Sequence, residues 1–136
     1  MKDVNDLKEI ISKISKDTGV EIPNGYKYRY APYQCWKCHK DILIFIWSDR
    51  SLLGGDSDIP PEPRPRSLQL RSTQMSGESY WANTCTYCDS VQGDFFIKAE
   101  PDSPFFSTVD EVIDTKESFD TDMDKIANYY FTELYQ

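Results

Sequence analysis

Two Cys-x-x-Cys pairs constrain this chain more than any other feature. The first pair is Cys35 and Cys38, and the second is Cys85 and Cys88. Together they account for all four cysteines among the 136 residues. Two such pairs can place four thiolates tetrahedrally around one Zn²⁺, because each short turn holds two sulfurs at a fixed spacing. We therefore predict one structural Zn²⁺ bound by these four residues.

An apolar stretch follows each cysteine pair. Ile42 to Trp47 comes after the first pair, and Val91 to Ile97 comes after the second. β-Branched and aromatic side chains are frequent in both stretches, which favours strands. The first stretch is apolar throughout, so we expect it to be covered on both faces, with the terminal helices as the available cover. A thioredoxin-like redox pair would open a helix, and strands in these places disfavour that function.

His39 allows two further interpretations of the first pair. It completes a Cys-x-x-Cys-His motif, the signature of c-type haem attachment, but a second cysteine pair and the lack of an apolar export signal disfavour haem. It could also replace a cysteine as a metal ligand. Because four thiols are available, we expect His39 and Asp89 to occupy instead the left-handed backbone position that glycine fills in many zinc knuckles.

Amphipathic helices are predicted at both ends of the chain. The N-terminal helix covers 4–18, with Asp3 or Asn5 as its cap and Gly19 at its end. The C-terminal helix covers 120–135, and three aspartates at its start complement the helix dipole. The apolar stripes are Leu7, Ile10, Ile11 and Ile14 in the first helix, and Met123, Ile126, Ala127, Tyr130, Phe131 and Leu134 in the second.

Shorter elements and loops are predicted between the helices. Tyrosines alternate with basic residues over 26–30, which favours a strand, and 68–71 has the pattern of a strand exposed on one face. Residues 80–83 lead into the second cysteine pair. Four closely spaced prolines mark 48–66 as an exposed loop. Residues 99–119 are predicted to be a linker.

These patterns together predict one α+β domain over residues 1–136. Its core at 26–98 is a four-cysteine zinc-ribbon antiparallel β-sheet, and the N-terminal and C-terminal amphipathic helices pack on that sheet. The 46 residues between the two cysteine pairs are compatible with one shared site, because the entropy cost of loop closure rises only slowly with length.

The cysteine segments resemble a zinc-ribbon module. The resemblance lies in CWKC at 35–38 and in YWANTCTYC at 80–88, continuing through VQGDFF at 91–96. The resemblance covers about residues 30–98. This part of the chain is similar to small zinc-ribbon proteins of bacteria and phages. It implies the same four cysteine ligands and is specific for the metal. The chain departs from the pattern in lacking knuckle glycines and in its long insertion.

The charge distribution suggests a function in protein interaction. The net charge is −8, and residues 89–136 alone hold twelve acids and three lysines, a net −9. We therefore expect a zinc-stabilised protein-interaction module whose acidic C-terminal region meets a basic surface of a partner protein. An inhibitor, an antitoxin or an immunity-type protein would each fit this description. A single histidine and a zinc shell already filled by cysteines disfavour catalysis.

A nucleic-acid-binding zinc ribbon is the alternative function. Bases and aromatic residues intermingle over 26–71, and such a mixture can contact phosphates and stack on bases. The residues expected to form this surface are Lys27, Arg29, Arg64, Arg66 and Arg71.

The sequence also allows a prediction of the cellular compartment. The N-terminal residues contain no apolar leader, and no stretch is apolar for long enough to cross a bilayer. We therefore expect a cytoplasmic protein whose cysteines are reduced and free to bind metal.

Overall fold

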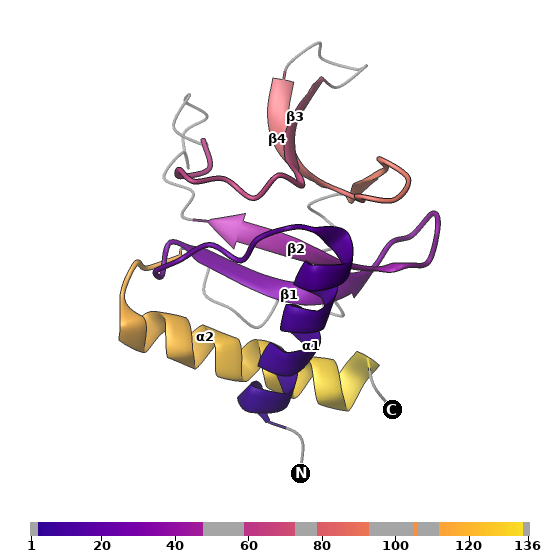
Figure 1. Cartoon of the computed structure of the whole chain (residues 1–136). Helices are drawn as coiled ribbons and strands as arrows, with labels where there is room; N and C mark the ends of the chain where they lie inside the picture. Colours follow the sequence, from indigo (N-terminus) through magenta and orange to yellow (C-terminus); the bar gives the residue numbers. More distant parts are fainter. Residues whose placement is uncertain (1–2, 48–58, 73–78, 93–104, 106–111, 135–136) are drawn as a thin grey trace.

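The computed structural model describes residues 3–47, 59–72, 79–92, 105 and 112–134. These residues form an α+β protein with two antiparallel sheets, one of two strands and one of three (Figure 1). The predicted fold class is confirmed, although the single predicted sheet is divided in two. The elements are α1 (Val4–Thr18), β1 (Tyr28–Gln34), β2 (Asp41–Trp47), β3 (Leu68–Ser72), β4 (Ser79–Thr84), β5 (Val91–Gln92), α2 (Lys116–Tyr129) and the π-helical turn η2 (Tyr130–Leu134).

The β1–β2 hairpin and the two helices contain most of the described core. The hairpin pairs Tyr28 with Trp47 at one end and Gln34 with Asp41 at the other. Residues 42–46 of β2 are all buried, as the apolar pattern predicted. Helix α1 contacts both strands, and α2 contacts β1 and α1. Strand β4 also contacts β2, so the helices do not supply the whole cover of this strand.

Helix α1 has the predicted bounds and caps. The Asp3 carboxylate accepts hydrogen bonds from the N–H groups of Asn5 and Asp6, which satisfies donors that an uncapped helix would leave free. Gly19 ends the helix in the left-handed conformation, with φ of 73°. This conformation is readily available to glycine because it has no Cβ.

Helix α2 begins at Lys116 and not at 120. The Thr115 hydroxyl accepts a hydrogen bond from the Ser118 N–H and caps the helix there. Asp122 therefore lies inside the helix, where it is buried, and not at the N-terminal end of the helix dipole. The sequence pattern places the helix start at the aspartates because their charges complement the helix dipole, whereas the helix begins four residues earlier, after the Thr115 cap.

The described part of the proline-rich loop packs against the protein. Residues 48–58 lie outside the described ranges, and 59–66 contain no regular strand or helix. Pro60 and Pro65 are buried, and the Tyr28 hydroxyl donates a hydrogen bond of 2.6 Å to the Pro61 carbonyl. At this end of the loop, two prolines are thus buried, whereas Ile59, Glu62, Pro63 and Arg66 are exposed.

Several other predicted elements lie partly outside the described ranges. Strand β5 covers only Val91–Gln92 of the predicted strand at 91–97, because 93–97 are not described. Within the predicted linker at 99–119, the described residues are 105 and 112–119, and the last four belong to α2. Neither α-helix in the described ranges is long and apolar enough to cross a bilayer.

The Asn83 side chain joins the two sheets. Its carboxamide accepts a hydrogen bond from the Phe45 N–H at 2.8 Å and donates one to the Phe45 carbonyl at 2.9 Å. Asn83 lies in β4 and is 1% exposed. Strand β1 pairs with one edge of β2, and Asn83 satisfies both backbone groups of Phe45 as a neighbouring strand would.

Replacing Asn83 by alanine should destabilise the protein by about 2–6 kcal/mol. The change leaves a buried N–H and a buried C=O without partners, and each such group costs about 1–3 kcal/mol. Urea denaturation followed by circular dichroism measures the effect. Asn128→Ala, at an exposed position of α2, is the matched control. Equal stability of the two variants would contradict the bridging role of Asn83.

Candidate metal centre

The two cysteine pairs occupy two similar turns that face each other. Cys35 and Cys38 lie in the turn between β1 and β2, and Cys85 and Cys88 lie in the turn between β4 and β5. We call each turn a knuckle. The four sulfur atoms all lie within 4.8 Å of one another. Residues that are 47 and 53 positions apart are thereby brought together, as the sequence predicted.

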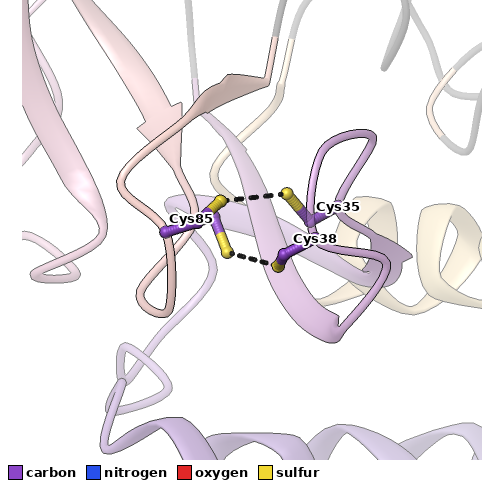
Figure 2. Close-up of side chains that lie close together, drawn as sticks. Cys35, Cys38 and Cys85 are labelled. Atoms are coloured by element: carbon purple, nitrogen blue, oxygen red, sulfur yellow. Dashed lines mark hydrogen bonds between the residues drawn. The ribbon is translucent and has the colours of Figure 1, made fainter.

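The sulfur separations suit a tetrahedral metal site. Cys35 Sγ lies 3.6 Å from Cys88 Sγ, and Cys38 Sγ lies 3.6 Å from Cys85 Sγ (Figure 2). A metal–sulfur distance of about 2.3 Å gives a tetrahedron with edges of about 3.8 Å. The cluster can therefore hold a metal ion with little movement. Within the described ranges, the four cysteines form the only cluster of possible metal ligands, and His39 is not part of it.

The two knuckles share one backbone conformation. His39 and Asp89 occupy equivalent positions with φ of 63° and 66°, which confirms the predicted left-handed geometry. In each knuckle, the N–H of the left-handed residue donates to the carbonyl of the first cysteine. The N–H of the first cysteine donates to the carbonyl of the residue five positions later in the chain. These bonds are His39 to Cys35 (2.9 Å), Cys35 to Lys40 (3.0 Å), Asp89 to Cys85 (2.8 Å) and Cys85 to Ser90 (2.9 Å).

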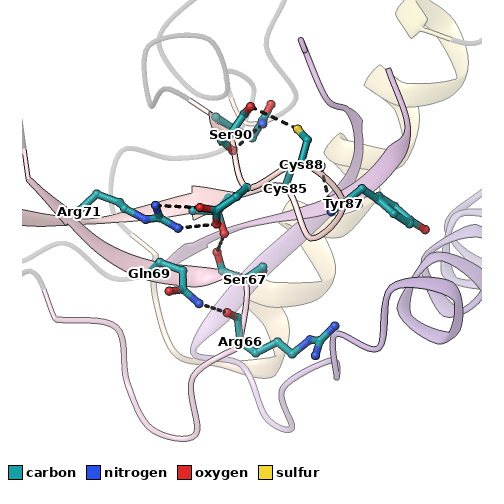
Figure 3. Close-up of polar contacts among 11 residues, drawn as sticks. Arg66, Ser67, Gln69, Arg71, Cys85, Tyr87, Cys88 and Ser90 are labelled. Atoms are coloured by element: carbon teal, nitrogen blue, oxygen red, sulfur yellow. Dashed lines mark hydrogen bonds and ion pairs between the residues drawn. The ribbon is translucent and has the colours of Figure 1, made fainter. Parts of the chain in front are cut away.

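Hydrogen-bond donors surround the sulfur atoms. The buried Gln92 side chain donates from Nε2 to Cys35 Sγ at 3.4 Å and to the Ser90 carbonyl at 3.0 Å. The Tyr87 N–H donates to Cys85 Sγ at 3.4 Å, and Ser90 Oγ lies 3.2 Å from Cys88 Sγ (Figure 3). Such contacts stabilise thiolates and orient metal ligands. Neither Gln92 nor Ser90 was predicted from the sequence, since no ligand-type spacing marks either residue.

The thiols have unequal acidities. Hydrogen bonds from the Ser90 side chain and backbone lower the pKa of Cys88 to about 6. Burial raises the pKa of Cys85 to about 12. A divalent cation among the four sulfurs would favour the thiolate form of each, because coordination to a metal stabilises the negative charge.

Contacts between the knuckles also hold the site together. The Trp36 indole N–H donates to the Val91 carbonyl at 2.8 Å. Lys40 Nζ lies 4.6 Å from the centre of the Tyr87 ring, a cation–π contact. Each contact joins the first knuckle to the second or to the strand that follows it.

The structure does not support the predicted nucleic-acid surface at Arg29. Arg29 is 0% exposed, and its Nε donates to Asp122 Oδ2 at 2.8 Å. It therefore cannot contact nucleic acid, and its inclusion in that surface is wrong. The alternating tyrosines and bases indicated a strand with its bases outside, but the ion pair with α2 draws Arg29 into the interior.

The other four predicted bases have different environments. Arg71 donates to both carboxylate oxygens of Asp89, at 2.6 and 3.2 Å (Figure 3). Arg64 pairs with Glu62 and stacks on Trp81, and Arg66 donates to the Thr18 carbonyl at the end of α1. Lys27 is exposed. Intramolecular partners thus engage all three of these arginines.

The fold and the site define an α+β protein with a cluster of four cysteines at metal-binding distance. Comparisons of the chain with protein-family models, with curated proteins and with solved structures find no match. The function must therefore be inferred from the site itself.

Proposed function

We propose that this protein is a zinc-stabilised protein-interaction module without catalytic activity. The observation that carries the proposal is the cluster of four sulfurs within 4.8 Å of one another. Four thiolates are a preferred ligand set of structural Zn²⁺, and they fill its tetrahedral shell. No coordination position then remains for a water or a substrate, so the metal would stabilise the fold and not react.

The zinc part of the proposal is tested by native mass spectrometry of the purified protein. We expect one zinc ion per chain under native conditions and none after denaturation. Substitution of Co²⁺ for zinc should give the intense visible absorption of tetrahedral cobalt–thiolate. Cys38→Ser should lose both signals, whereas Ser12→Ala, at an exposed position of α1, should keep them. A metal-free, fully folded protein would overturn the proposal.

The proposed interaction function rests on the uneven charge of the chain and on the contacts that hold the two knuckles together. The basic partner surface predicted from the sequence remains a prediction, as do the inhibitor, antitoxin and immunity-type roles. Asp89 and Asp120 are ion-paired at the surface, and Asp122 is paired in the interior. The described part of the acidic region therefore presents less free negative charge than the sequence count indicates.

Affinity capture at low and high salt tests the interaction part. We expect the zinc-loaded chain to retain a protein partner that high salt releases and that Cys38→Ser does not retain. Recovery of no such partner, or equal recovery with both chains, would count against an interaction module that depends on zinc.

A further inference from the structure

Two sulfur–sulfur contacts cross between the knuckles, and each joins a partly exposed cysteine to a buried one. Partly exposed Cys88 lies 3.6 Å from buried Cys35, and partly exposed Cys38 lies 3.6 Å from buried Cys85 (Figure 2). We propose that this centre is also redox-sensitive: a hydroperoxide converts the two contacts into disulfides between the knuckles, and the site gives up its metal. The inference rests on the proposed zinc site and adds a reaction of its cysteines.

Solvent exposure decides which sulfurs an oxidant reaches first. Cys38 and Cys88 are partly exposed, whereas Cys35 is 0% and Cys85 is 2% exposed. The thiolate is the form of cysteine that hydroperoxides oxidise, and a metal ligand is a thiolate. Redox-sensing cysteines are typically accessible and lie next to a second cysteine that completes the disulfide. Both contacts between the knuckles have this arrangement.

The reaction consumes one hydrogen peroxide for each disulfide. The Cys88 thiolate attacks one peroxide oxygen, the O–O bond breaks, and a sulfenic acid forms as hydroxide leaves. The Cys35 thiolate then attacks the Cys88 sulfur, and the S–O bond breaks with loss of a second hydroxide. Two sulfurs thus lose two electrons, which the peroxide gains. Cys38 and Cys85 react in the same way, and each disulfide removes two ligands from the site.

Contacts that do not involve a metal hold the knuckles face to face. The Gln92 side chain donates to Cys35 Sγ at 3.4 Å, and the Trp36 indole N–H donates to the Val91 carbonyl at 2.8 Å. Both contacts attach the first knuckle to β5, the strand that follows the second knuckle. A disulfide needs its sulfurs about 2.0 Å apart, so each pair between the knuckles must close by about 1.6 Å. The contacts with β5 therefore favour disulfides between the knuckles over disulfides within one knuckle.

The oxidised centre would differ from a centre that has only lost its metal. Two disulfides between the knuckles attach the β4–β5 turn covalently to the β1–β2 turn, whereas reduced cysteines without metal leave the turns unlinked. Oxidation also changes the local charge, because four thiolates around a divalent ion carry a net −2 and two disulfides carry no charge. The exposed Lys37 and Lys40 of the first knuckle then lose the negative charge beside them. Oxidation would thus alter this surface while keeping the second sheet attached.

Disulfide mapping of the zinc-loaded full chain tests the inference. The protein is treated with a small excess of hydrogen peroxide, and the remaining thiols are blocked with N-ethylmaleimide. Trypsin cleaves after Lys37 and chymotrypsin after Tyr87, so a digest with both places the four cysteines on separate peptides. Mass spectrometry then identifies the linked peptides. We expect the main pairs to be Cys35 with Cys88 and Cys38 with Cys85.

Two further measurements follow the metal and the sheet. A colorimetric zinc indicator should show that zinc is released as the disulfides form, and dithiothreitol with added zinc should restore binding. Hydrogen–deuterium exchange of the oxidised chain should show protection at 79–92 close to that of the zinc-loaded chain. The control is the reduced chain treated with a chelator, which should lose this protection.

The variant Trp36→Phe tests the contact that holds the first knuckle against β5. It keeps an aromatic ring and removes the N–H that donates to the Val91 carbonyl. We expect the share of disulfides within a knuckle to rise at least about threefold, the effect of losing one hydrogen bond. Leu70→Ala, at an exposed position of β3, is the matched control and should leave this share unchanged. An equal share in both variants would count against the inference.

Three results would overturn the inference. They are zinc that stays bound in excess peroxide, disulfides mainly within each knuckle, and loss of protection at 79–92 in the oxidised chain. A zinc-containing protein that gives any of these results would disprove the redox reaction and leave the proposed function intact. Absence of zinc from the purified, reduced protein would disprove the proposed function itself.

Discussion

If the proposed Zn²⁺ is bound, its removal is expected to release β3, β4 and β5 while α1, α2, β1 and β2 stay folded. Within the described ranges, the three-stranded sheet and its knuckle contribute only Leu68 and Cys85 to the buried apolar cluster of the core. The helices and the β1–β2 hairpin supply nearly all the rest, including Leu7, Phe45 and Ile126. Structural zinc contributes about 10 kcal/mol or more where folding depends on it. The small sheet has little apolar burial to replace that stabilisation.

Hydrogen–deuterium exchange with and without a chelator measures this release. We expect faster exchange at 68–72 and 79–92 after chelation, and also at the Phe45 amide, which donates to Asn83 of β4. Protection in α1 and in the rest of β2 should not change. Restoring zinc should restore protection. Uniform loss of protection over the whole chain, or no change anywhere, would contradict the selective release of the three-stranded sheet.

Replacing Asp122 by alanine is expected to cost about 3–5 kcal/mol. The change leaves the Arg29 guanidinium charged, buried and without its carboxylate, which is the costly way to disrupt a buried ion pair. Arg29 also donates to the carbonyls of Tyr26 and Ile113 and to Ser118 Oγ. The guanidinium thus attaches α2 to β1, and loss of its carboxylate should loosen α2.

A double substitution separates the charge effect from packing. Arg29→Met with Asp122→Leu removes both charges, so it should be less destabilising than Asp122→Ala. Chemical denaturation followed by circular dichroism gives the free energies of unfolding. The control is Asp120→Ala, which breaks the exposed pair with Lys116 and should have little effect on stability. If Asp122→Ala unfolds at the same denaturant concentration as the control, the buried pair does not stabilise α2.

Much of the local structure could be predicted because its causes lie close together in the sequence. The Asp3 cap and the Gly19 end of α1 depend on residues within one helical turn, and the structure has both. The left-handed positions of His39 and Asp89 follow from the tight turns around each cysteine pair. The predicted start of α2 was wrong because three aspartates gave a stronger signal than the single Thr115.

The chain by itself determined the four candidate ligands, since two cysteine pairs at this spacing are the pattern of a site with four thiolates. It also determined which stretches are apolar enough to be buried. Only the tertiary structure decided that Arg29 pairs with Asp122, that Asn83 satisfies the edge of β2, and that Gln92 contacts a cysteine sulfur. Those partners are 93, 38 and 57 positions apart, and a polar residue shows no local pattern when its partner is supplied by a distant element.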